Sequence, residues 1–214
     1  IRSLSTPDAL DTRIGTLRFL DGVPTPDTTA AVLDHLTFTH ALSTYLDAFP
    51  IASTYAMREG FADIGADDNA VAIYSELMDS SSLFLTANAD TVYFVGIIDL
   101  TDGPIVLETP PDSLGTIDDL WFRWVTDFGV PGPDRGAGGH YLLVPPGYDG
   151  PLPEGGFYVA HSETNRVLLL GRSFLQDDDP APTVAVSKDR LKIYPYVAGG
   201  LGTSVATLLE GVVP

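Results

Sequence analysis

Residues 116–127, with the sequence TIDDLWFRWVTD, carry the side chains best suited to chemistry. If the segment forms one strand, side-chain alternation places Asp119, Trp121, Arg123 and Asp127 on the same face. A Trp ring can stack on a ligand, Arg can donate two parallel hydrogen bonds, and Asp can act as an acid or a base. The segment therefore predicts a polar ligand site, although a ladder of Asp–Arg ion pairs on a half-exposed strand explains the same pattern.

A second polar cluster lies at the beginning of an apolar stretch. Asn88, Asp90 and Thr91 precede Tyr93, and Asn88, Asp90 and Tyr93 could contact a ligand. Asn and Asp also bond readily to nearby backbone amides, so that they cap and bend the start of a strand. Both interpretations stay open for this cluster.

The other polar segments do not match known metal or nucleotide motifs. His35 and His40 lie five residues apart on an expected helix and point in different directions, and the chain has no Cys. The acidic run 177–179 lacks the alternating pattern of a calcium loop. The Gly-rich run 129–139 lacks the Lys of a P-loop and precedes a strand instead of a helix. We therefore expect no metal and no cofactor, and the sequence assigns no catalytic residue.

The charge of the chain limits its partners. The 29 acidic and 11 basic residues give a net charge of −18, which repels phosphate backbones and anionic headgroups. We therefore expect no nucleic acid partner. No apolar run reaches the roughly 18 residues of a membrane span. Asp outnumbers Glu, which is typical of charge in turns or of a saline habitat, and the start at Ile1 fits a removed leader. These features favour an extracellular or periplasmic location.

The elements that must position these side chains change in character along the chain. Thr25, Pro26 and Asp27 are a typical helix start, and apolar residues at spacings of three and four then predict a helical region over 25–65 with one buried stripe. Pro50 interrupts it, which predicts a helical hairpin or a kinked helix.

Residues 83–196 have the alternation and turn residues of short antiparallel strands, with 91–100 and 105–109 expected to form a hairpin. The sequence thus predicts an α+β fold, mainly antiparallel β, as a sandwich-like or curled sheet with an N-terminal helical hairpin packed on it. We expect one domain over 1–196 and an apolar tail over 197–214. Further strands are expected at 117–127, 140–144, 156–161 and 166–175.

Several strings resemble the domain of unknown function numbered 1254. The resemblance extends over nearly the whole chain and is carried by GTLRFLDGVPTPDT (15–28), AFPIASTYAMREGF (48–61), LTANADTVYFVGIIDLTDGPIVLETPP (85–111), GPDRGAGGHYLLVPPGYDGPLPEGGF (132–157) and LKIYPY (191–196). The positions that match the signature of that family are Asn88, Asp90, Thr91, Tyr93, Asp99, Gly103 and Pro104.

The resemblance implies a β-rich domain of exported proteins that a second β-rich domain usually follows in the same polypeptide. The tail 197–214 is apolar apart from Glu210. Because an uncovered apolar patch tends to find a partner, we expect a homo-oligomer or contact with a second β-rich domain through this tail.

Two hypotheses for the function follow. The first is a non-catalytic extracellular module that builds an assembly or binds a ligand. The alternative is a hydrolase or another enzyme that acts on a glycan or polar substrate, with Asp119 and Asp127, or Asp90, as acid and base around Arg123. The relative positions of Asn88, Asp90, Trp121 and Arg123 would separate the two.

Overall fold

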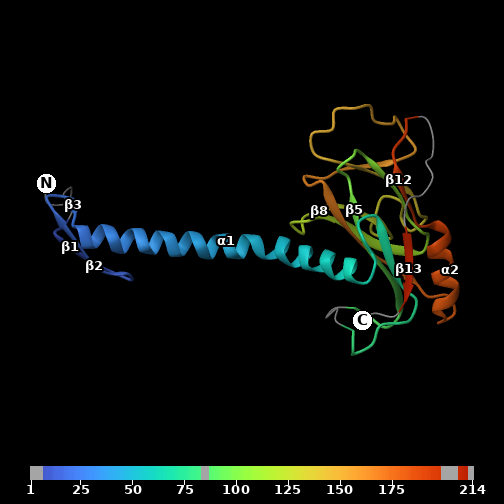
Figure 1. Cartoon of the computed structure of the whole chain (residues 1–214), viewed down its shortest axis with the longest axis horizontal. Helices are drawn as coiled ribbons and strands as arrows, with labels where there is room; N and C mark the ends of the chain where they lie inside the picture. Colours follow the sequence, from blue (N-terminus) through green and yellow to red (C-terminus); the bar gives the residue numbers. More distant parts are fainter. Residues whose placement is uncertain (1–6, 83–86, 199–206, 212–214) are drawn as a thin grey trace. The chain divides into compact units, whose positions relative to one another are not determined.

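The computed structural model describes residues 7–82, 87–198 and 207–211, and Figure 1 shows their elements. The chain divides into two compact units, Ile1–Phe49 and Pro50–Pro214, which we call unit 1 and unit 2. Helix α1 (Pro26–Asp63) passes from one unit into the other. No helix of the described residues has the length and hydropathy required to span a membrane.

Unit 1 begins with a small antiparallel sheet of strands β1 (Ala9–Thr12), β2 (Gly15–Leu20) and β3 (Val23–Pro24). The hydroxyl of Thr25 accepts a hydrogen bond from the Thr28 amide over 3.3 Å, so that Thr25 caps α1 as predicted. The Thr28 hydroxyl accepts from the Arg18 amide over 2.8 Å and donates to the Arg18 carbonyl over 3.0 Å. These bonds fasten β2 to the start of the helix.

Of the two forms predicted at Pro50, a helical hairpin or a kinked helix, the hairpin is wrong, because α1 continues through this residue as one helix. Proline removes one amide donor, but residues 48–57 contain no Gly, Asn or Asp that could form a turn. The Pro50 carbonyl accepts from the Thr54 hydroxyl over 2.7 Å, one turn further along the helix. A proline without turn residues therefore leaves this helix unbroken.

The apolar stripe on the first part of α1 was predicted to be buried, and this is also wrong. Its large side chains are exposed, from 45% for Leu36 to 63% for Tyr45. Periodicity identifies the apolar face of a helix, but it does not supply an element to cover it. The exposed residues of this face are Leu33, Leu36, Leu42, Tyr45, Leu46 and Phe49.

Two sheets build unit 2, and both are antiparallel except for one strand pair in each. They confirm the predicted α+β fold with mainly antiparallel strands. The six-stranded sheet has the order β13 (Thr207–Gly211), β4 (Ala70–Tyr74), β5 (Thr91–Asp99), β11 (Arg166–Phe174), β7 (Ser113–Asp119), β8 (Trp124–Gly129). The four-stranded sheet has the order β10 (Tyr158–His161), β9 (His140–Val144), β6 (Ile105–Glu108), β12 (Lys192–Pro195).

The predicted hairpin of residues 91–100 and 105–109 is wrong, although both strands exist. Strand β5 lies in the six-stranded sheet, whereas β6 pairs with β9 and β12 in the other sheet. Turn residues predict that the chain changes direction, but they do not predict in which sheet the next strand lies. The tail contributes β13, which pairs in parallel with β4, while its residues 199–206 and 212–214 lie outside the described residues.

The main core lies between the two sheets, as in a sandwich. The ring of Phe128 from β8 lies 5.9 Å from that of Phe94 on β5 and 6.2 Å from that of Tyr141 on β9. Gly115 and Gly171 face each other in register, and a Cβ atom on them would lie 2.1 Å and 2.8 Å from the Phe128 ring. The two glycines therefore make room for this ring.

The opposite face of the six-stranded sheet is its outer face, and α1 covers part of it. Phe61 and Met57 of this helix pack with Tyr74, Val95 and other apolar residues of β4, β5 and β11. Helix α2 (Pro180–Arg190) contributes Val184 to the main core. Beyond Phe61 and Met57, the outer face carries Arg172 of β11, Thr116 of β7 and Asp127 of β8 beside Leu114 and Leu170.

Candidate functional site

The polar part of the outer face forms an open groove across four strands. Residues paired in register share a face of a sheet, and two such rows cross β5, β11, β7 and β8. The cavity has a volume of 330 Å³. We call it the outer groove, and its lining residues are Tyr93, Leu114, Gly115, Thr116, Asp127, Pro131, Leu170, Gly171 and Arg172.

Arg172 occupies the first row, between Tyr93 on β5 and Leu114 on β7. Its Nη1 atom donates to the Tyr93 hydroxyl oxygen over 3.5 Å, at the long limit of a hydrogen bond. The Asn88 amide donates to the same oxygen over 3.2 Å. Among residues 7–82, 87–198 and 207–211, no carboxylate forms an ion pair with Arg172. Its guanidinium therefore keeps donors for a ligand.

The second row brings two aspartates of different character together. Thr116 pairs with Asp127, which lines the groove, and the Thr116 hydroxyl donates to the Asp118 carboxylate over 3.1 Å. Asp118 is only 7% exposed. Burial raises the pKa of Asp118, and the charges of Asp127 and Asp119 raise it further against the lowering effect of the Thr116 bond. Asp127 of the groove is thus half-buried, while Asp118, which does not line the groove, is buried nearby and has a raised pKa.

The predicted strand 117–127 is wrong, because these residues form the β7–β8 hairpin. Phe122 adopts a positive φ of 60°, and the Asp119 carboxylate accepts from the amides of Trp121 over 2.8 Å and Arg123 over 3.0 Å. The Arg123 guanidinium also pairs with Asp119 over 2.6 Å and with Glu163 over 3.0 Å. Asp119 is therefore a buried turn residue, which overturns its predicted role as an acid beside Arg123.

Of the residues expected to contact a ligand, the groove brings together Tyr93 and Asp127. Asn88 touches Tyr93, but its side chain shapes the start of β5 by accepting from the Thr91 hydroxyl over 2.5 Å and the Asp90 amide over 3.3 Å. Asp90 is exposed, as is Trp121 at the hairpin turn. Sequence reasoning missed Arg172 and Asp118, because their place depends on which strands become neighbours.

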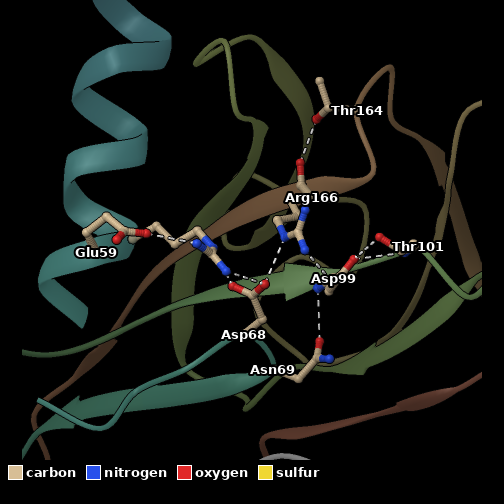
Figure 2. A network of polar contacts seen from close by, with 8 residues as sticks. Glu59, Asp68, Asn69, Asp99, Thr101, Thr164 and Arg166 are labelled. Atoms are coloured by element: carbon tan, nitrogen blue, oxygen red, sulfur yellow. Dashed lines mark hydrogen bonds and ion pairs between the residues drawn. The ribbon is translucent and has the colours of Figure 1, made fainter. Parts of the chain in front are cut away.

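A network of ion pairs, separate from the outer groove, fastens α1 to the six-stranded sheet, and Figure 2 shows it. The Asp68 carboxylate accepts from Arg58 Nε of α1 over 2.7 Å and from Arg166 Nε of β11 over 2.8 Å. Arg166 also pairs with Asp99 over 2.8 Å, and the Asp99 amide donates to the Asn69 side chain over 3.0 Å.

Burial alone would raise the pKa of Asp68, but the hydrogen bonds and charges of Arg58 and Arg166 hold this pKa below its usual value. Each charged group of this cluster has a partner of opposite charge. The cluster therefore acts as a structural fastener between α1 and the sheet.

The Gly-rich segment 129–139 is built around a buried carboxylate. Asp134 is 6% exposed and accepts from the amides of Gly129 over 2.7 Å and Gly138 over 3.0 Å, and from the Tyr141 hydroxyl over 2.5 Å. Burial, together with Asp134, raises the pKa of Tyr141 well above its usual range. The segment carries Pro131 to the rim of the outer groove.

The sequence match decides the family. The profile of the protein of unknown function DUF1254 matches residues 69–195, more than half of the chain. This chain belongs to the DUF1254 family. The matched region of the DUF1254 domain includes every residue that lines the outer groove, whereas Arg58 and Asp68 precede it.

The fold of the DUF1254 domain has a counterpart among solved structures. The crystal structure of the VPA0106 protein from Vibrio parahaemolyticus aligns with a TM-score of 0.57 and 18% sequence identity. The alignment covers 76% of this chain and 40% of the Vibrio chain, so that the DUF1254 chain spans less than half of that protein. None of the curated proteins matches the sequence.

Proposed function

We propose that the DUF1254 domain binds a polar ligand in the outer groove without transforming it. The observation that carries this proposal is the guanidinium of Arg172, which forms no ion pair with any described residue and lines the same groove as the carboxylate of Asp127. An Arg that faces solvent usually loses no stability when it lacks an ion pair. Arg172, however, is held by the strands beside apolar side chains and hydrogen-bond acceptors. Convergent polar groups on a rigid sheet are typical of a binding site.

The groove offers complementary groups to such a ligand. The Tyr93 hydroxyl accepts from Arg172 and Asn88, so its own proton is free to be donated to a ligand. Asp127 accepts hydrogen bonds, while Leu114 and Leu170 supply apolar surface between the polar groups. A ligand with both hydroxyl groups and apolar ring faces, such as a glycan, satisfies all of these groups.

The test is a panel of neutral and acidic disaccharides added to the labelled protein, with amide shifts followed by NMR. We expect the shifts to centre on Gly115, Gly171 and their strand neighbours, and to disappear in the variant Asp127→Asn. The exposed turn variant Asp102→Asn is the matched control and should bind as the wild type does. A panel without any binder, or shifts that map to another surface, would refute the proposal.

A second candidate function, hydrolysis of a polar extracellular substrate such as a glycan, has one specific observation in its favour. Burial and the nearby charge of Asp127 raise the pKa of Asp118, and an acid paired with a base is the arrangement of glycoside hydrolysis. The NMR samples separate the two functions, because a catalytic groove converts the bound saccharide during the experiment. Cleavage that stops in Asp118→Asn with binding retained would favour the enzyme.

The location and assembly of the protein remain part of the proposal. The net charge of −18 and the excess of Asp over Glu support an extracellular or periplasmic location, which fractionation of the source cells tests. The exposed apolar face of α1 supports assembly with a second copy or with a further domain. Light scattering at high concentration tests the first of these partners.

A further inference from the structure

We infer that the ligand of the outer groove is an acidic saccharide whose carboxylate binds Arg172 while hydroxyl groups of its far end bind Asp127 and Thr116. This inference rests on the proposed binding function and names the class of its ligand. It follows from the order of side chains across the strands.

The first argument is the separation of the two charged groups. Arg172 is on β11 and Asp127 is on β8, with β7 between them. Neighbouring strands lie about 4.8 Å apart, so the two backbones are separated by about 10 Å. Both side chains line the same cavity. A ligand that touches both must therefore be larger than one small anion and carry different groups at its two ends.

The second argument is the chemistry of each end. A guanidinium with free donors binds carboxylate best, because two parallel hydrogen bonds form. The Asp127 carboxylate accepts hydrogen bonds and repels a second anion, and the neighbouring Asp118 is buried. The end of the ligand near Asp127 must then be neutral and rich in donors, as sugar hydroxyl groups are.

The third argument is the surface between the two ends. Leu114 pairs in register with Arg172, and Leu170 pairs with Thr116, so that the two Leu side chains lie between these polar groups. Pro131 adds an apolar rim. A pyranose ring has an apolar face of C–H groups and hydroxyl groups on its edge, so it fits such a surface better than a uniformly polar ion. Two linked rings span about the distance between Arg172 and Asp127.

The charge of the whole protein makes Arg172 decisive. A net charge of −18 repels an acidic ligand at a distance. A preference of the groove for an acidic over a neutral ligand must therefore come from a short-range contact. Among the described residues, Arg172 is the basic side chain that lines the cavity. Loss of this guanidinium should therefore abolish the preference for the acidic ligand and leave the hydroxyl contacts in place.

The experiment compares cellobiouronic acid with cellobiose, which have the same length and differ in one carboxylate. We expect calorimetry with the full chain to give at least tenfold tighter binding of the acid. In Arg172→Gln the two sugars should bind equally and weakly, and Arg172→Lys should restore only part of the preference. Asp127→Asn should weaken both sugars by a similar factor.

Three results would overturn this inference. Equal binding of the two sugars by the wild type contradicts the acidic ligand, and it leaves the proposed binding function intact. If both sugars fail while only neutral disaccharides of the panel bind, the acidic ligand is contradicted, whereas the proposed function fails only if the whole panel shows no binder. If Arg172→Gln still binds the acidic sugar more tightly than cellobiose, the ligand carboxylate does not bind Arg172, and the inference is contradicted. Circular dichroism of each variant ensures that a lost preference does not reflect unfolding.

Discussion

Arg172 of β11 and Tyr93 of β5 lie opposite each other in register, and the Arg172 Nη1 atom is 3.5 Å from the Tyr93 hydroxyl oxygen. The two residues are 79 positions apart in the sequence and meet only because β11 inserts between β5 and β7. This pairing places a guanidinium and a phenol hydroxyl together in the outer groove. Three acids of unit 2, Asp118, Asp68 and Asp134, lie in different environments, and the effects of their substitution on stability distinguish them.

Asp118→Asn should stabilise the protein at neutral pH. The folded pKa of Asp118 is raised, so the stability that this group contributes is present below its unfolded pKa of about 3.9 and is lost as pH rises through the folded value. Asn keeps an acceptor for Thr116 without the buried charge. Chemical denaturation from pH 3 to 7 should show no difference at pH 3 and a growing advantage of the variant above it. A variant less stable than the wild type at pH 7 would contradict the raised pKa.

Asp68→Asn should have the opposite effect. The arginines lower the folded pKa of Asp68, so its contribution is present above about pH 4 and is lost as pH falls through the folded value. Loss of charged hydrogen bonds to Arg58 and Arg166 should cost about 2–3 kcal/mol at pH 7. The gap to the wild type should narrow in denaturation curves between pH 4 and 2. Asp102→Asn, at an exposed turn, is the control for both acids and should follow the wild type at every pH.

Asp134→Ala should destabilise the Gly-rich segment and the groove rim together. It removes the buried carboxylate that accepts hydrogen bonds from the amides of Gly129 and Gly138 and from the Tyr141 hydroxyl. Each unsatisfied buried donor costs about 1–3 kcal/mol, so we expect a loss of at least about 2 kcal/mol in urea denaturation. Asp134→Asn should cost less because one acceptor oxygen remains. Wild-type stability of the alanine variant would mean that water replaces the carboxylate without cost.

Leu42→Glu combined with Leu46→Glu should reduce any self-association of the chain. Both side chains are exposed on the apolar face of α1, and charges there oppose burial against a second copy. Light scattering at high concentration should give a lower mass for this double variant than for the wild type. Thr44→Glu adds a charge to the same helix at a polar exposed position and serves as the control. A monomeric wild type would remove the assembly from the proposed function.

The sequence by itself determined the kinds of elements in this protein. Thr25 and Pro26 marked the start of α1 because capping and a fixed proline φ act locally, and alternation in residues 91–100 and 166–175 gave β5 and β11 nearly to the residue. Helix α2 was missed, because residues 83–196 were predicted as strands, although Asp179 before Pro180 is a similar local signal and accepts from the Ala181 amide over 3.0 Å.

Only the tertiary structure decided where the site lies. Residues 117–127 alternate like one strand, yet the Asp119 carboxylate and the positive φ of Phe122 reverse the chain there without a glycine or proline. The groove joins β5, β11, β7 and β8, whose order differs from that in the sequence. The side-chain pattern of a segment indicates whether it is a helix or a strand, whereas long-range pairing decides which strands lie next to each other. The candidate site depends on the second, because its residues come from neighbouring strands that are far apart in the sequence.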